Sequence, residues 1–250
     1  MPASIKLLSS RRFRPFFVTQ LGGAFNDNLY KNGLTIFIAF QAAGISQQQS
    51  NMLVNVAAGL FILPFFLFSP IAGQLADKYE KSMLIQRIKL LEIAIMLLGA
   101  GAFLLQSPIL LVAILFLMGT QSALFGPVKY SLLPEALKST ELIGGNAMVE
   151  FGTFLAILAG LIVSVYLMSL GLEAMALAIV VVAAGGYCTG LRAGVARRLE
   201  AIGVGERVAS GSADEGHPAQ LCRIDIRGRV QVGVDVAVRP VIEIDRGDRE

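Results

Sequence analysis

The chain contains no tryptophan, a single histidine and two cysteines among its 250 residues. His217 lies in a polar stretch near the C-terminus, so no Ser-His-Asp or Cys-His catalytic arrangement can form in the apolar part. Cys188 and Cys222 are too few for a disulfide framework or a metal site, and we expect unpaired thiols. A GxxxxGK[ST] phosphate loop and the HxxxxD pattern of glycerolipid acyltransferases are also absent. We therefore predict no enzyme, no ATP-driven pump, no cofactor and no bound metal.

Charged residues are also scarce, at 16%, whereas hydrophobic residues make up 55% and the mean hydropathy is +0.67. This composition is too apolar for an ordinary soluble domain. A helix needs about 20 apolar residues to cross a bilayer. The first apolar run lacks an A-x-A cleavage site and is not interpreted as a signal peptide. We predict an all-α membrane protein with six spans at about residues 14–43, 52–75, 83–105, 109–133, 142–168 and 172–190.

Lys and Arg are distributed unevenly over the predicted loops. They occur before the first span, around the second-to-third connection, between spans four and five, and after span six. The other connections, at 44–51, 106–108 and 169–173, contain none. The positive-inside rule then predicts a multi-pass protein with both termini in the cytoplasm. The net charge of +3 follows from this topology, and no basic-aromatic face predicts a nucleic-acid partner.

The first span is interrupted by the polar stretch FNDNLYKNG at residues 25–33. A charge at mid-bilayer costs about 2.5–3.5 kcal/mol on insertion scales, so it is rare without a paired or functional role. Asp27 and Lys31 are four residues apart with the acid first, which favours a pair on one helical face. We expect this cluster to face a cavity between helices. The alternative is a buried structural pair that fixes helix packing.

Weaker polar groups occur in other spans. Asn146 and Glu150 are also four residues apart, with Thr153 near the same face, and Gln121, Ser122 and Lys129 lie in span four. Arg87, Lys89 and Glu92 occupy the cytoplasmic third of span three, where we expect Arg87 and Lys89 to extend towards the lipid headgroups. The candidate substrate or coupling residues are Asn26, Asp27, Asn28, Lys31, Lys129, Asn146 and Glu150.

The connection after the second span reads GQLADKYEK, residues 73–81. It resembles the GxLaDrxGrr signature of the major facilitator superfamily. The resemblance implies that Asp77 helps to close a cytoplasmic gate, with Lys78 and Lys81 as supporting basic positions. Gly73 would permit close packing at the helix end. The second glycine of the signature falls on Glu80 here, which argues against the tight turn of the family.

Two further stretches resemble the lysophospholipid-transporter branch of that superfamily, which includes members fused to an acyltransferase and acyl-carrier-protein synthetase. They read GGAFNDNLYKNGL at 22–34 and GTQSALFGPVKYSLLPEAL at 119–137, and the resemblance extends over about residues 10–188. It implies a secondary transporter in a bacterial-type inner membrane that flips lysophospholipid to the inner leaflet for re-acylation, with an acyltransferase as partner or fused domain. It also implies that Lys129 meets the lipid phosphate and that Asp27 or Glu150 meets the ammonium.

Superfamily members usually carry twelve spans in two halves, with the substrate between them. Only an N-terminal half, residues 1–190, is expected here, which leaves open a homodimer of two halves, a carrier of another small solute, or a non-transporting fragment or interaction protein. Residues 191–250 form a cytoplasmic tail in which CRIDIRGRVQVGVDVAVRPVIEID, residues 222–245, alternates as strands do. The tail lacks Lys, Phe, Asn, Met, Tyr and Trp, so we favour an out-of-frame translation over a genuine β module.

Overall fold

The computed structural model describes residues 7–10, 13–42, 44, 46–191, 222–224 and 230–232. The chain divides into two units, Met1–Arg197 and Arg198–Glu250. In the second unit the described residues form two antiparallel strands, β1 (Cys222–Ile224) and β2 (Val230–Val232), with Arg223 opposite Gln231. These strands lie within the stretch whose alternation predicts strands, and the rest of the predicted tail lies outside the described residues.

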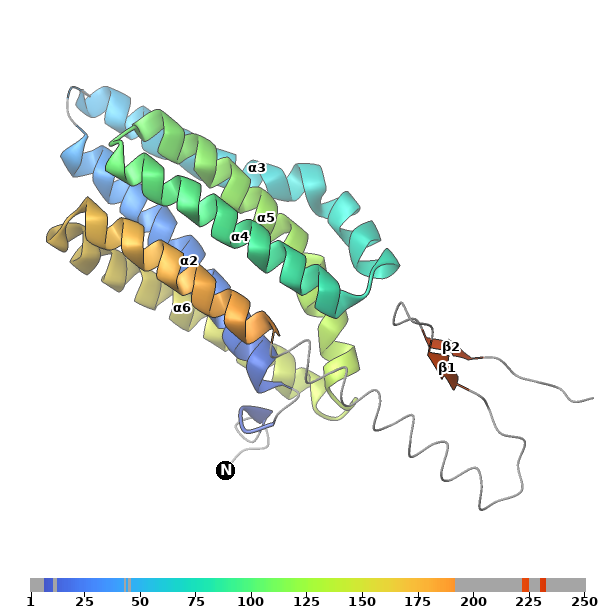
Figure 1. Ribbon diagram of the computed structural model, residues 1–250. Coiled ribbons are helices and arrows are strands. Elements are labelled where there is room, and N and C mark those ends of the chain that lie inside the picture. Colours follow the sequence, from blue (N-terminus) through green and yellow to red (C-terminus); the bar gives the residue numbers. More distant parts are fainter. Residues whose placement is uncertain are drawn as a thin grey trace, which may run out of the picture. The chain divides into compact units, whose positions relative to one another are not determined.

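The first unit is a bundle of long helices (Figure 1). Its elements are α2 (Arg14–Ile36), continued by a π-helical turn η1 (Phe37–Gln41), α3 (Gln47–Lys78), α4 (Lys81–Leu104), α5 (Pro108–Ala136), α6 (Leu142–Leu170) and a last helix, Leu172–Leu191. A helix therefore covers each of the apolar runs from which the sequence predicts spans.

Short polar segments end one helix and begin the next. The Ser46 hydroxyl accepts a hydrogen bond from the Gln49 backbone N–H, and the Gln49 side chain accepts one from the Ser46 N–H, a capping box that starts α3. Ser107 caps α5 ahead of Pro108, which needs no N–H partner in the first turn. Gly171, at φ 122°, separates α6 from the last helix with a backbone conformation that favours glycine.

Successive helices run in alternating directions, so their connections gather at two ends of the bundle. Figure 1 shows the α2–α3, α4–α5 and α6–Leu172 connections at one end and the α3–α4 and α5–α6 connections at the other, with the start of α2. The first end has the three connections without Lys or Arg, and the second has Lys78, Lys81 and Lys138. The fold thus collects the basic connections at one end, while the side of the membrane that this end faces remains a prediction.

In the part of the chain that the structure describes, four helical segments are long and apolar enough to cross a membrane: Gln47–Lys78, Pro108–Pro134, Leu142–Leu170 and Leu172–Leu191. α2 is excluded by its polar stretch around Asp27, and α4 by Arg87, Lys89 and Glu92. Six spans therefore remain a prediction.

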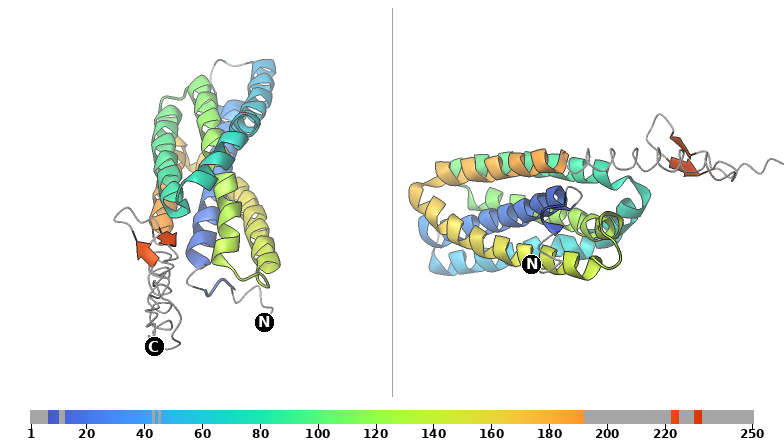
Figure 2. Two further views of the ribbon diagram at one scale, coloured as in Figure 1. Left: turned by 90° about the vertical axis from the view of Figure 1, so that its right-hand side faces the viewer. Right: turned by 90° about the horizontal axis from the view of Figure 1, so that it is seen from below.

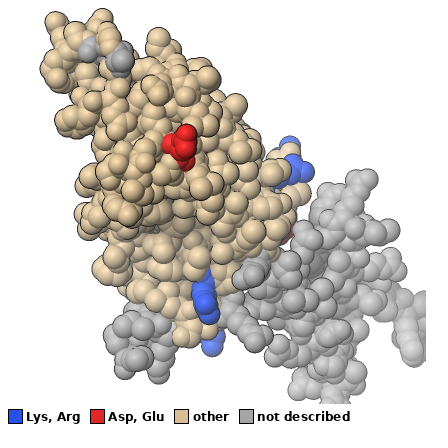
Figure 3. All heavy atoms as spheres, turned by 60° about the vertical axis from the view of Figure 1, so that its left-hand side comes forward, with Lys and Arg blue, Asp and Glu red and all other residues tan. Residues whose placement is uncertain are grey.

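One face of the molecule is almost free of charge, with one acidic patch and with basic atoms near its margins (Figure 3).

The bundle interior consists of two apolar clusters separated by polar residues. One cluster is centred on Tyr30, Met96 and Phe103, and the other on Phe13 and Ile88. α2 contributes to both clusters and runs through the middle of the bundle when it is seen from below (Figure 2). The part of α2 between the clusters carries the polar stretch predicted as a functional site.

Candidate functional site

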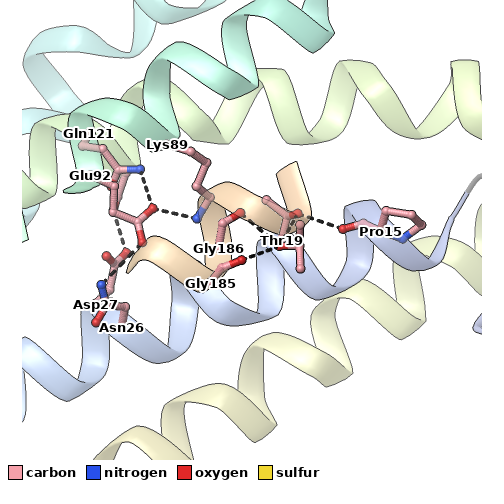
Figure 4. A network of polar contacts seen from close by, with 11 residues as sticks. Pro15, Thr19, Asn26, Asp27, Lys89, Glu92, Gln121, Gly185 and Gly186 are labelled. Atoms are coloured by element: carbon pink, nitrogen blue, oxygen red, sulfur yellow. Dashed lines mark hydrogen bonds and ion pairs between the residues drawn. The ribbon is translucent and has the colours of Figure 1, made fainter. Parts of the chain in front are cut away.

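The boundary between the two apolar clusters is a group of polar side chains from three helices, here called the polar layer. Its members are Asn26 and Asp27 of α2, Lys89 and Glu92 of α4, and Gln121 and Ser122 of α5 (Figure 4). The two charges of α4 pair with each other, whereas Asp27 finds its partner on α5 and the amides of Asn26 and Gln121 find theirs on α4, so the layer joins the three helices.

The centre of the polar layer is the ion pair between Lys89 and Glu92. The Lys89 ammonium donates to Glu92 Oε2 over 2.6 Å, and both side chains are 1% exposed. Glu92 also accepts weaker hydrogen bonds from the amides of Asn26, at 3.5 Å, and Gln121, at 3.4 Å. A buried carboxylate with three donors around it is well compensated, whereas either charge alone would not be.

The Lys89 ammonium fits between two glycines. A Cβ added at Gly23 of α2 would come within 2.7 Å of Lys89 Nζ, and one added at Gly186 of the last helix within 3.5 Å. Near the Lys89 ammonium, a hydrogen bond of 3.0 Å between the hydroxyls of Thr19 and Thr189 connects α2 with the last helix. Small residues at these positions therefore allow a charged side chain to occupy the space between α2 and the last helix.

Asp27 has an incomplete set of hydrogen-bond partners. The Ser122 hydroxyl donates to Asp27 Oδ2 over 2.6 Å. The other carboxylate oxygen, Oδ1, is buried and has no partner among the described residues, and the same holds for Asn26 Oδ1. Buried carboxylate oxygens are normally satisfied, so these two acceptors leave room for a donor or a cation that the described residues do not supply.

The predicted Asp27–Lys31 pair does not form within the described residues. Asp27 is directed towards Ser122 on α5, while the Lys31 ammonium lies over the Phe61 ring of α3, 5.2 Å from its centre. A spacing of four residues places two side chains on one face of a helix, but the direction of each side chain depends on its contacts with neighbouring helices. Here α5 offers a hydroxyl to the carboxylate, and α3 offers an aromatic face to the ammonium.

The expectation that Lys89 extends to the headgroups is wrong, because its ammonium is buried against Glu92. The same expectation for Arg87 agrees with its exposed side chain. The candidate residues chosen from the sequence also omitted Lys89, Glu92, Gln121 and Ser122. The signal was present: Lys89 and Glu92 are three residues apart, which places opposite charges on one helical face.

The remaining candidates lie elsewhere. Lys129 and Tyr130 of α5 both reach Glu150 of α6, with Lys129 Nζ at 3.4 Å and the Tyr130 hydroxyl donating over 2.8 Å to its Oε1. The Glu150 side chain is 47% exposed, so this pair is peripheral rather than buried. Asn146 is exposed, and Asn28 donates to the Ala24 carbonyl and packs against Gly160 of α6.

The signature connection forms a two-residue turn between α3 and α4. Tyr79, at φ −110°, and Glu80, at φ −62°, are both extended, so the turn requires no glycine at Glu80. The Glu80 carboxylate caps α4 by accepting from the N–H groups of Ser82 and Met83. The tight turn thus forms in spite of the substitution, which corrects the expectation drawn from the sequence.

The predicted gate residues occupy this turn and the end of α3. Asp77 and Lys78 are exposed in the last turn of α3, and Lys81 begins α4. Gly73 has open space where a Cβ would stand, so the close packing expected at this position is absent among the described residues. The gate role of these residues stays a prediction.

Comparison with known proteins gives partial similarity to one class of transporter. The chain is 30% identical over 164 residues to the lysophospholipid transporter LplT of Photorhabdus laumondii, and 29% identical over 156 residues to those of Escherichia coli and Shigella boydii. These matches cover 65% and 61% of this chain. The chain spans only 38% and 36% of the lengths of these relatives. No family model and no solved structure matches the chain.

Proposed function

We propose that residues 1–190 form the N-terminal six-helix half of a major-facilitator-type secondary transporter that moves lysophospholipid across the inner membrane. The proposal is supported by the similarity to lysophospholipid transporters and by long apolar helices enclosing a polar layer. The observation that carries it is the Asp27 carboxylate, which is buried between helices with one oxygen lacking a partner. A site of this kind suits the cationic part of a lipid headgroup.

The polar groups divide into two places along α5. Ser122, which contacts Asp27, and Lys129 are seven residues apart, so they are separated by about 10 Å along the helix axis. In the proposed mechanism Lys129 meets the lipid phosphate as a point charge near the basic end of the bundle. Asp27 meets the ammonium deeper in the bundle, while the single acyl chain stays among apolar side chains or lipid. Glu150 competes for Lys129 when no phosphate is bound.

The proposal includes further parts that follow the family resemblance. Asp77 is proposed to close the cytoplasmic side against a second half, supplied by a longer chain or by a second copy in a homo-oligomer. An acyltransferase would consume the delivered lysophospholipid. Two other functions remain open: a major-facilitator carrier of another small solute, and a membrane interaction protein that transports nothing.

The experiment is flipping of fluorescent lysophosphatidylethanolamine by the full chain reconstituted in vesicles, together with equilibrium binding of the same lipid. We expect binding to weaken about tenfold or more in Asp27→Asn, since the ammonium loses its charged partner. Asn55→Ala is the matched control, because Asn55 is exposed on α3 and is not among the candidate residues. Helical circular dichroism verifies that each variant is folded.

Binding of lysophosphatidylethanolamine that is equal in the wild-type chain and Asp27→Asn would contradict the assignment of Asp27. Absence of both binding and flipping would favour the interaction protein. Binding without flipping would support the headgroup site and assign movement to an assembly of two halves.

A further inference from the structure

A cleft opens on the side of the bundle beside the α3–α4 turn, here called the α3–α4 cleft. Its volume is about 270 Å³, and the residues used below are Leu75, Tyr79, Met83, Arg87, Leu91 and Leu124. Four of these are aliphatic or thioether side chains contributed by α3, α4 and α5. The cleft is separate from the polar layer, because none of the polar-layer residues lines it.

Two basic groups accompany this apolar cleft. Arg87 is exposed, and no carboxylate of the described residues lies within 4.0 Å of its guanidinium. The Lys78 ammonium lies over the Tyr79 ring, 5.7 Å from its centre. Two exposed acids are nearby, Asp77 at the end of α3 and Glu80 in the turn, where Glu80 caps α4; neither lines the cleft. The cleft therefore combines apolar walls with positive charge.

The position of Arg87 along α4 agrees with the depth of lipid phosphates. Arg87 is six residues after Lys81, the first residue of α4, which places it about 9 Å from the helix start. Each headgroup layer of a bilayer is about 5–8 Å thick. The Arg87 guanidinium, on its flexible stem, can reach the phosphate level while Leu91, one turn deeper, lies at acyl-chain depth.

We propose that the α3–α4 cleft binds an anionic phospholipid of the cytoplasmic leaflet, with one acyl chain in the cleft and the phosphate at Arg87. The volume is below the usual range for a complete small-molecule site, so it suits a chain segment rather than a headgroup. Arginine binds phosphate oxygens in a bidentate manner, and basic pockets between helices at a cytoplasmic membrane face bind anionic lipid heads. The bound lipid is a resident of the membrane and not the transported molecule.

This inference rests on the proposed function in requiring that the helices lie in a bilayer with the α3–α4 turn on the cytoplasmic side. The experiment uses the full chain in vesicles that contain phosphatidylglycerol or phosphatidylcholine with a photoactivatable group on one acyl chain. Labelled positions are then mapped by peptide mass spectrometry. Residues 83–91 of α4 report on the cleft, and residues 154–162 on the outer side of α6 report on general lipid contact.

We expect phosphatidylglycerol to label residues 83–91 more strongly than phosphatidylcholine does. Arg87→Gln lowers this labelling about fivefold, which corresponds to about 1 kcal/mol for one basic residue near a membrane surface. Arg87→Lys keeps the positive charge but loses the bidentate geometry, so its labelling falls between those of the wild-type chain and Arg87→Gln. The matched control is Lys138→Gln, which removes an exposed basic residue from the α5–α6 connection and leaves the labelling of α4 unchanged.

Equal labelling of residues 83–91 by the two lipids, or labelling that Arg87→Gln does not change, overturns the proposal. An equal loss in Lys138→Gln also overturns it, since the effect then comes from general surface charge. Absence of label from α4 and α6 alike contradicts the membrane location and therefore the proposed function too. If α6 is labelled and α4 shows no preference for phosphatidylglycerol, only the proposed lipid site in the α3–α4 cleft is overturned.

Discussion

The buried ion pair of the polar layer gives the most direct test of how this bundle is held together. Lys89→Met removes the ammonium and leaves Glu92 buried, with only the amides of Asn26 and Gln121 as donors at 3.5 and 3.4 Å. Removing one partner of a buried pair costs about 3–5 kcal/mol, because the remaining charge is uncompensated. For a protein of this size, about 2–4 °C per kcal/mol gives a fall in the melting temperature of about 6–20 °C.

The double variant Lys89→Met with Glu92→Gln distinguishes charge from shape. The glutamine side chain keeps a carbonyl oxygen for Asn26 and Gln121, and the layer then contains neither charge of the pair. We expect the double variant to recover most of the loss and to lie within about 2 kcal/mol of the wild-type protein. Lys129→Met is the matched control, because its partner Glu150 is 47% exposed, and its loss should be about 0–1 kcal/mol.

The assay is unfolding of the full chain in mixed micelles, monitored by helical circular dichroism: heating gives the melting temperature, and increasing denaturing detergent gives the free energy of unfolding. The reasoning is refuted if Lys89→Met loses no more stability than Lys129→Met. It is equally refuted if the double variant is as unstable as the single variant, since the uncompensated carboxylate would then not be the cause.

Three further changes test the packing of the bundle by the same measurement. Gly119→Ala should destabilise it by about 1–3 kcal/mol, because the new Cβ would lie 2.5 Å from the Phe61 carbonyl oxygen. Gly22→Ala is the control, because its Cβ meets open space, and it should be neutral or stabilising. Equal effects of the two variants would contradict the close approach of α3 and α5. Glu80→Ala should lower stability by about 1 kcal/mol through loss of the α4 cap, while Glu80→Asp retains most of it, and a silent Glu80→Ala would mean that the cap contributes nothing. Tyr30→Phe should cost about 0.5–1.5 kcal/mol, because the buried hydroxyl donates to the Leu111 carbonyl over 2.9 Å, and an unchanged midpoint would argue against that hydrogen bond.

The helices could be predicted from the sequence, while the contacts of the site could not. Apolar runs predict the helices, and the structure has a helix over each run, although α2 continues through its polar stretch at residues 25–33. Partners of Asp27 depend on the rotation of α5 about its axis, which no local pattern encodes. Ser122 is 95 residues away in sequence, so the closer Lys31 was the natural but wrong choice.

The roles of Gly23 and Glu80 likewise depend on the surrounding structure and not on the local sequence alone. The space that Gly23 leaves for the Lys89 ammonium depends on the position of α4, which the sequence around Gly23 does not show. The replacement of a glycine by Glu80 argued against a tight turn, because the family signature has glycine at this position. In the structure, extended backbone at Tyr79 and Glu80 makes the connection, and the carboxylate gains a capping role.

The polar layer also constrains the order in which this chain can enter a membrane during synthesis. α2 and α4 are not apolar enough to be counted as spans by themselves. The charges of α4 pair with each other, but the Asp27 carboxylate of α2 gains its Ser122 partner only when α5 is present. Because α2 is made first, it must wait beside the insertion machinery, or at the membrane surface, until the later helices arrive. Membrane insertion of this bundle therefore depends on several helices together: α2 is synthesised first, but it is stabilised in the membrane only after α5, the last helix of the polar layer, has been synthesised.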